Sequence, residues 1–311
     1  MELCLNLIEQ IIYLVLMAMG GFFLGKAKLI TSEECRALSV LSVYLLTPCM
    51  LLRSFLMDWT TQKRSGILLA LTAAAAVYAL FFLLTFLLRK LMPLSEIDAA
   101  SLIYTNAGNI LIPLVAGTLG VEYVFYASGY MVVQNLLMWT YGVRAIGKQR
   151  SPQFRRILTN PALLAIGIGF LYMMLPIPLP PVLREAVDGI GACLAPISMI
   201  LIGILFAGID KNSGKHMAGI ARITALRLLG YPAVALVFLS VFSRFLNHPD
   251  SKNILFVILL ASCAPSAAQV PQVAQMFDNE ADRASCINVT TTLMCVVTFP
   301  IFTLLAQICF A

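Results

Sequence analysis

The sequence predicts an all-α polytopic membrane protein, with ten transmembrane helices in two inverted five-helix repeats and crossed broken helices in spans 4 and 9. The first observation behind this prediction is composition. Hydrophobic residues make up 60% of the 311 residues and charged residues 12%, whereas a soluble domain typically has about 25% charged residues. With a mean hydropathy of +0.90, the chain has too few charges to cover the surface of a soluble protein of this length.

Long apolar segments are the second observation. A helix of about 20 apolar residues crosses a bilayer that is about 30 Å thick. The predicted spans are residues 7–25, 36–57, 66–88, 98–119, 122–143, 159–176, 184–208, 217–245, 253–276 and 283–310. The N-terminal segment lacks the basic start and the small-residue cleavage site of a signal peptide, so we expect it to be retained as span 1. The longest loop follows span 5 and divides the chain into residues 1–150, the first repeat, and residues 151–311, the second.

The distribution of basic residues predicts the orientation. If the N-terminus is outside, the cytoplasmic loops hold 14 Lys and Arg residues and the outer loops hold 6, which leaves Arg227 within span 8. Basic residues concentrate on the cytoplasmic side of membrane proteins, so we expect both termini outside. Each half then has an odd number of spans, and the halves have opposite orientations, as in secondary transporters built from inverted repeats.

Matching interruptions in the two halves are the third observation. Span 4 contains TNAGNILIP at residues 105–113, and span 9 contains CAPSAAQVP at residues 263–271. Proline and glycine disrupt a helix interior, and paired interruptions in the two halves of a transporter point to its binding site. Spans 2 and 7 also carry prolines at similar places, Pro48 and Pro196. For these two prolines, a simple kink is the alternative interpretation.

A break in a membrane helix exposes backbone groups that protein or water must satisfy, so we expect both breaks inside the bundle near the bilayer midplane. Each half-helix that restarts there presents its N-terminus, which carries about half a positive charge and favours an anion. The candidate substrate-binding residues at the breaks are Asn106, Asn109, Pro113, Pro265, Ser266, Gln269 and Pro271. Neighbouring spans add Thr47, Ser198, Gln134 and Asn135. The alternative is that the amide side chains only satisfy the broken backbone.

Two further polar features stay open at this point. The stretch NVTTT at residues 288–292 adds hydroxyl groups to span 10, although threonines in membrane helices often bond only their own backbone. Arg227 is a candidate to attract an anion or to pair with Asp188. Arg53 lies near the outer end of span 2, and we expect its side chain to extend to the membrane surface.

Missing groups exclude several classes of function. No Asp or Glu lies in the middle of spans 4, 5, 9 or 10, so the titratable carboxylate that a sodium/proton antiporter needs is missing there. No nucleophile has a paired base, so we expect no enzyme. The 8 cysteines are scattered, and the only 2 histidines, His216 and His248, lie in predicted loops. We therefore expect neither a metal site nor a cofactor, and no nucleic-acid partner.

Several of these stretches resemble the auxin efflux carrier family. TNAGNILIPLVAGTLG, from residue 105, resembles the family signature N-x-G-x-x-x-x-P-L, and YASGYMVVQNLLMWTYG at 126–142 is similar to the next span of bacterial members. NPALLAIGIG at 160–169 resembles the start of the second half, and ASCAPSAAQVPQVAQMF at 261–277 resembles the second crossing helix. The resemblance covers essentially the whole chain. Residues 109–110 depart from the usual pattern, and the long central loop of plant carriers is missing.

This resemblance implies the fold of the bile-acid/sodium symporters, with a scaffold of spans 1, 2, 6 and 7 and a mobile transport domain of spans 3–5 and 8–10. It implies a multi-pass transporter of the bacterial inner membrane that carries a small organic anion, a mono- or dicarboxylate, by an elevator mechanism. The implied partners are the bilayer, the anion and a second copy bound through the scaffold. It assigns site roles to Asn106, Pro113 and Pro271. Open alternatives are a sodium- or proton-coupled symporter and a membrane sensor without transport.

Overall fold

The structure is a computed structural model that describes residues 2–31, 34–56, 60–107, 111–148, 159–175, 179–208, 217–246 and 249–310. Within these ranges the regular structure is helical, apart from one isolated bridge between Thr105 and Ser266. Three of the described helical segments are long and apolar enough to cross a membrane, namely Thr61–Leu91, Ala218–Ser243 and Ala281–Phe310. The described part of the chain is thus all-helical with clear apolar spans, as predicted, while the count of ten spans and the inverted repeat stay predictions.

The chain forms two compact units, and each combines segments from both halves of the sequence. The first unit comprises residues 1–67, 108–128 and 158–210, and the second comprises residues 68–107, 129–157 and 211–311. The two units divide the chain differently from the two predicted sequence repeats. They therefore do not test the prediction of the repeats.

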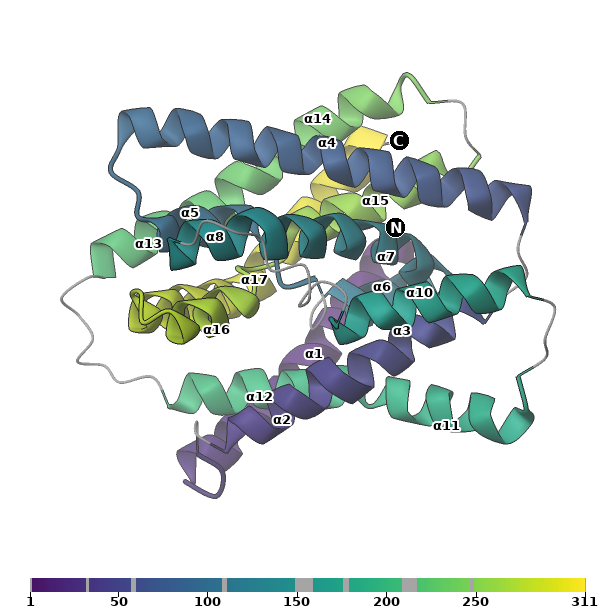
Figure 1. Ribbon diagram of the computed structural model, residues 1–311, viewed down its shortest axis with the longest axis horizontal. Coiled ribbons are helices and arrows are strands. Elements are labelled where there is room, and N and C mark those ends of the chain that lie inside the picture. The colour runs from purple at the N-terminus through teal and green to yellow at the C-terminus, as the bar shows by residue number, and fades with distance from the viewer. Residues whose placement is uncertain are drawn as a thin grey trace. The chain divides into compact units, whose positions relative to one another are not determined.

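In the first unit, α1 (Glu2–Lys26) packs along α12 (Leu194–Ala207) with the two backbones in close approach (Figure 1). A Cβ on Gly21 would overlap the carbonyl of Ile200, and a Cβ on Gly203 would overlap the backbone of α1. Small residues at such positions let membrane helices pack closely through van der Waals contact. The two glycines therefore set the spacing of this helix pair.

A π-helical turn carries the next part of the first unit past a proline. α2 (Cys35–Leu41), η1 (Ser42–Leu46) and α3 (Thr47–Phe55) follow one another without interruption, and Pro48 is the second residue of α3. A proline lacks an N–H and clashes with the carbonyl four residues before it. The wider π turn accommodates both defects, so Pro48 does not stop the helix.

Pro196 has a different local structure from its predicted counterpart in span 2. α11 (Pro181–Ala192) ends before Cys193, which forms a turn, and Pro196 lies in the first turn of α12. Between the two alternatives that the sequence left open for Pro196, the structure has an interruption within residues 184–208, where one helix ends and the next begins. A proline in the first helical turn costs little, since the N–H that it lacks would have no partner at that position.

α3 is the centre of packing in the rest of the first unit. It packs against α11 and against α10 (Pro161–Met174), and Figure 1 shows α3 beside both helices. The ring centroid of Phe55 lies 5.1 Å from that of Phe125 and 5.7 Å from that of Phe170. These distances lie in the range of favourable aromatic pairs.

The second unit surrounds a buried helix, α15. Its helical elements are most of α4 (Thr61–Leu91), α5 (Glu96–Ile103), the later part of α7 (Val121–Leu137), η3 (Met138–Gly142), α8 (Val143–Gly147), α13 (Met217–Ala225), η5 (Leu226–Gly230), α14 (Tyr231–Ser243), α15 (Ser251–Cys263), α16 (Gln269–Met276) and α17 (Ala281–Phe310). Every residue from Ile254 to Cys263 is buried, and a helix that is apolar on all sides belongs in the interior. α14 and α17 pack against it, and α16 packs on α17.

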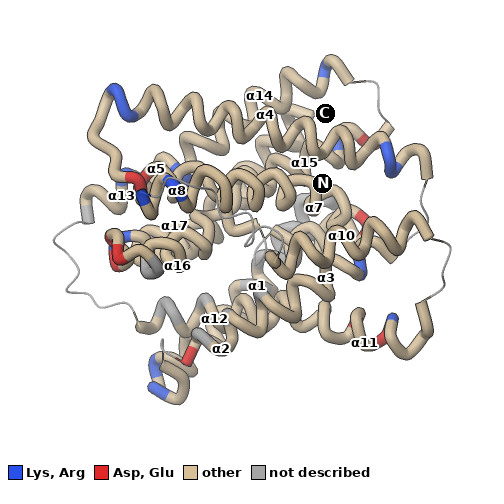
Figure 2. Tube along the Cα trace, viewed as in Figure 1, with Lys and Arg blue, Asp and Glu red and all other residues tan. Residues whose placement is uncertain are grey.

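The charged residues of α4 and of the π turn η5 fit a membrane environment differently. In Figure 2 the long middle of α4 is uncharged and its basic residues lie at its ends. η5, in contrast, carries Arg227 with its side chain fully buried. Pro232 is the second residue of α14, directly after η5, so this π turn precedes a proline just as η1 does.

Candidate functional site

Both interruptions predicted from the sequence are present. α5 ends at Ile103 and is followed by non-helical residues 104–106, before α6 (Ile112–Thr118) begins further along the chain. Residues 264–268 separate α15 from α16. Tyr104 and Ala264, which directly follow α5 and α15, have extended backbones instead of helical ones. Asn109 lies outside the described residues.

The two breaks pair with each other through the isolated antiparallel bridge. The N–H of Asn106 donates to the carbonyl of Pro265 at 2.8 Å, and the N–H of Ala267 donates to the carbonyl of Tyr104 at 3.0 Å. A membrane offers no water to unpaired backbone groups. Pairing the breaks therefore satisfies groups that each broken helix alone would leave open.

Gln134 of α7 holds the span 4 side of the bridge. Its Nε2 donates to the carbonyl of Thr105 at 2.8 Å, while its Oε1 accepts from the N–H of Thr105 at 3.3 Å and from its hydroxyl at 2.7 Å. The hydroxyl of Tyr78 donates to the same Oε1 at 2.7 Å. Gln134 therefore satisfies both backbone groups of Thr105, which is the alternative role that the sequence left open for the amides.

α17 holds the span 9 side of the bridge in a similar way. The N–H of Ser266 donates to Oγ1 of Thr291 at 3.2 Å, and the carbonyl of Ser266 accepts from Nδ2 of Asn288 at 2.7 Å. Both partners belong to the NVTTT stretch. Thr291 also donates to the carbonyl of Ile287 in its own helix at 2.8 Å, so this threonine serves its own backbone and the break together.

Arg227 caps the C-terminal ends of both broken helices. Nη1 donates to the carbonyl of Leu102, in the last turn of α5, at 2.9 Å. Nη2 donates to the carbonyls of Ser262 and Ala264 at the end of α15, both at 2.7 Å, and Nε donates to Ala264 at 3.1 Å. None of the carboxylates that the structure describes forms an ion pair with Arg227.

This arrangement corrects the suggested pairing of Arg227 with Asp188. Asp188 pairs with Arg53, whose Nε lies 3.2 Å from Oδ1 of the carboxylate, within the first unit. The two side chains are 33% and 37% exposed, so Arg53 has a partner in addition to its access to solvent. The guanidinium of Arg227 is used by backbone carbonyls, which attract a cation because the last carbonyls of a helix have no partner inside the helix.

The start of α16 contains two buried polar atoms that the fold does not use. The Oγ of Ser266 and the Oε1 of Gln269 have no hydrogen-bond partner among the described residues, and Ser266 is 0% exposed. The Nε2 of Gln269 donates to Oδ1 of Asn135 at 3.1 Å, which orients the amide. A hydroxyl donor beside a helix N-terminus is an arrangement that binds oxyanions.

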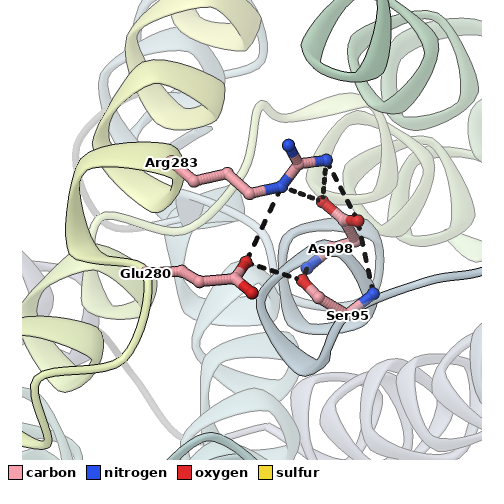
Figure 3. Close-up of polar contacts among 4 residues, drawn as sticks. All are labelled: Ser95, Asp98, Glu280 and Arg283. Atoms are coloured by element: carbon pink, nitrogen blue, oxygen red, sulfur yellow. Dashed lines mark hydrogen bonds and ion pairs between the residues drawn. The ribbon is translucent and has the colours of Figure 1, made fainter. Parts of the chain in front are cut away.

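A charged cluster ties the start of α5 to the turn between α16 and α17 (Figure 3). Ser95 and Asp98 cap α5 with a capping box. Arg283 of α17 donates to both oxygens of Asp98, at 2.8 Å from Nε and 3.1 Å from Nη2, and Glu280 accepts from the hydroxyl of Ser95 at 3.0 Å. α5 is therefore connected to the region of spans 9 and 10 at both of its ends, within the second unit.

The comparison with protein families gives the identity of the chain at the level of the family. The family model described as a membrane transport protein matches residues 6–153 and 151–303. The chain belongs to the auxin efflux carrier family. The resemblance inferred from its motifs is confirmed, and family membership makes the protein a membrane-embedded transporter. Proteins of this family are transporters and not enzymes. No curated protein matches the chain significantly.

The second unit of this family member brings together part of the predicted substrate site. Its members are Asn106, Gln134, Pro265, Ser266, Gln269 and Pro271, the last being the third residue of α16. Three others lie in the first unit. Thr47 begins α3, Ser198 is buried in α12, and Pro113 is the second residue of α6. Contact of any of these residues with a substrate stays a prediction.

The sequence analysis missed the residues that support the breaks from neighbouring helices. Asn288 and Thr291 were recognised only as a polar run, and Asn135 only as a span 5 side chain that could contribute to the site. Their signal in the sequence is a polar side chain inside an otherwise apolar span, which costs free energy unless it finds a partner. That signal shows that a partner exists but does not show which segment supplies it.

Proposed function

We propose that the protein transports a small organic anion, a mono- or dicarboxylate, by an elevator mechanism of alternating access. The start of α16 carries this proposal, because the buried hydroxyl of Ser266, which has no partner among the described residues, lies there at a helix break. The positive end of a helix dipole and a nearby hydroxyl donor together favour a carboxylate. Family membership supports transport, and the chemistry of these groups supports an anion.

Each polar group at the break has a proposed role. The hydroxyl of Ser266 donates to the substrate carboxylate. The Oε1 of Gln269 is an acceptor only, so it accepts from a substrate O–H, as in a hydroxy acid or a dicarboxylate that keeps one proton. The side chain of Asn106, which is 9% exposed, completes the proposed site. Gln134 holds the backbone of Thr105 in place and positions Asn106.

The proposed movement takes the second unit past the first, in a cell inner membrane with both termini outside. Spans 1, 2, 6 and 7 lie in the first unit, with residues 108–128 in addition. The close packing of α1 on α12 suits a scaffold, through which two copies would associate. The connections at both ends of α5 keep the paired breaks together as one block, so the block would carry its anion without changing shape.

Export of an anion in this way needs no coupling ion. The inside-negative membrane potential expels each negative charge with about 2.3 kcal/mol per 100 mV. Uptake of an anion would instead require sodium or proton coupling. Among the described residues, three carbonyls at the paired breaks that would suit sodium are already occupied by Arg227, which favours the uncoupled carrier over the symporter.

The test is solid-supported-membrane electrometry on purified protein in liposomes. Pulses of malonate, malate, succinate and indole-acetate are applied with and without sodium and pH gradients, to wild type, Asn106→Ala and Ser266→Ala. Removing one hydrogen bond to a charged group costs about 1.5–3 kcal/mol, so Ser266→Ala should weaken apparent affinity roughly tenfold or more. The matched control is Ser262→Ala, since Ser262 is equally buried but its hydroxyl bonds Ile258 of its own helix at 2.8 Å.

Each outcome separates the candidate functions. Anion currents that Ser266→Ala weakens and Ser262→Ala leaves unchanged support the proposed site. Currents that require a sodium or proton gradient favour the coupled symporter. Binding of an anion without any current favours the sensor. Silence for all four anions, with no binding, contradicts the carboxylate assignment.

A further inference from the structure

The guanidinium of Arg227 lies where a transporter with broken helices would hold a coupling cation. In such proteins, unwound backbone carbonyls and the C-terminal ends of half-helices coordinate sodium. Here the same two kinds of groups bind Arg227, because the carbonyls of Leu102 and Ser262 end α5 and α15, and the carbonyl of Ala264 belongs to the unwound break. Four N–H···O contacts of 2.7–3.1 Å join the side chain to these three oxygens.

The electrostatics of the site match one positive charge. Arg227 is 0% exposed, and no described carboxylate pairs with it. A helix C-terminus carries about half a negative charge, so the ends of α5 and α15 together supply roughly the charge of one anion. The ring of Phe81, whose centroid lies 5.5 Å from the guanidinium carbon, adds a cation–π contact.

We propose that Arg227 is a built-in cation that replaces a coupling ion at the paired breaks. The site is then a carbonyl cage for a monovalent cation, and the side chain fills it permanently. The cage itself is inferred from the folded structure alone and does not depend on the proposed function. Its consequence for transport, an anion carrier that needs no sodium at this position, rests on the proposed function.

A π turn gives Arg227 its position in the cage. η5 replaces a regular helical turn directly before Pro232, and the wider turn changes the direction in which its side chains leave the helix. Thr85 and Tyr231, whose hydroxyl oxygens lie 2.7 Å apart, link α4 to α14 beside this turn. η5 is thus held in place by this hydrogen bond outside the cage, in addition to the hydrogen bonds from Arg227 to the carbonyls.

The test is chemical rescue of Arg227→Ala, which empties the cage. Purified variant and wild type are unfolded thermally in detergent, in buffers that contain choline, sodium or millimolar guanidinium chloride. A ligand that binds only the folded state raises the unfolding midpoint. We expect guanidinium and sodium to raise the midpoint of the variant by on the order of 2 °C for each tenfold increase in concentration, and to leave wild type unchanged.

The matched control is Arg53→Ala, which removes the same side chain from the half-exposed pair with Asp188. Its midpoint should not respond to either cation, because no carbonyl cage is emptied. If the midpoint of Arg227→Ala does not rise in guanidinium or sodium, or if Arg53→Ala responds equally, the cage is not a cation site and the proposal is overturned.

A second variant covers the case in which Arg227→Ala does not fold. Arg227→Gln keeps two N–H donors for the carbonyls but no charge. We expect sodium to stabilise this variant over choline, and absence of that stabilisation also overturns the proposal. This readout uses no substrate, so it stands even if all four anions fail to produce a current. If a current exists, it should be independent of sodium in wild type and dependent on sodium in Arg227→Gln.

Discussion

The two sides of the paired breaks differ in how completely their polar groups are satisfied. On the side where α5 and α15 end, Arg227 binds three carbonyls with four hydrogen bonds. On the side where α16 begins, the Oγ of Ser266 and the Oε1 of Gln269 are buried without a partner among the described residues. Buried polar groups are normally paired. The difference indicates that the first side belongs to the permanent fold and that the second side is open for a ligand.

This comparison makes opposite predictions for the two sides. A substitution where the helices end removes partners that the folded state requires, so it should lower stability. A substitution at the start of α16 removes a group that the folded state does not use, so it should change transport and leave stability almost unchanged. Variants at the paired breaks, together with one at the start of α5, should therefore lose stability in the order Arg227→Ala, Gln134→Ala, Asp98→Asn and Ser266→Ala.

Replacing Arg227 by alanine should have the largest effect. Three buried carbonyls lose their partner, and removal of one partner from a buried charged arrangement typically costs about 3–5 kcal/mol. Reversible unfolding in mixed detergent micelles measures the change in free energy of unfolding. The control Arg53→Ala should cost about 1 kcal/mol or less, since its ion pair with Asp188 is partly exposed. Equal costs for the two variants would contradict the assigned role of Arg227.

Replacing Gln134 by alanine should have the next largest effect. The N–H and the carbonyl of Thr105 both lose their side-chain partner, at about 1–2 kcal/mol for each group. Asn288→Ala, which removes a partner only from the carbonyl of Ser266, should cost about half as much. Hydrogen exchange of the Asn106 amide should accelerate in Gln134→Ala, because that amide forms the bridge to Pro265. Unchanged exchange would show that Gln134 does not hold the bridge.

Replacing Asp98 by asparagine should have a smaller effect. The change keeps the shape of the side chain but removes the charge from two hydrogen bonds to Arg283, at a cost of about 1–2 kcal/mol. Glu280→Gln is the matched control. Its carboxylate lies 3.8 Å from Arg283 and its side chain is 44% exposed, so the cost should be about 0.5 kcal/mol. If Glu280→Gln lowers the free energy of unfolding more than Asp98→Asn does, Glu280 contributes more to this contact than Asp98.

Replacing Ser266 by alanine should have the smallest effect on stability and a large effect on transport. The removed hydroxyl has no partner among the described residues, so the free energy of unfolding should stay within about 0.5 kcal/mol of wild type. The anion current should fall in the same variant, as the proposed site requires. Thermal unfolding and electrometry on one preparation measure both. A clear loss of stability would show that the hydroxyl has a structural role.

Local signals in the sequence predicted the helices and the breaks well. The paired interruptions at residues 105–113 and 263–271 follow from proline, glycine and amide residues, which act on the helix that contains them. The same signals were ambiguous at Pro48 and Pro196. A π turn carries the chain past the first, and a helix end precedes the second. Proline shows that the backbone must change locally, and the packing around it selects the change.

The sequence by itself determined that this protein is embedded in a membrane, which family it belongs to, and where two of its helices break. These properties depend on composition and on residues that are neighbours in the chain. Only the tertiary structure decided which side chain serves each break. Arg227 reaches a carbonyl 125 residues away, and Gln269 reaches an amide 134 residues away. A cation buried inside a membrane span needs a partner with full or partial negative charge. The sequence alone contains several groups that meet this need equally well. The packing of the helices selects among them, because it alone determines which groups lie within hydrogen-bonding distance.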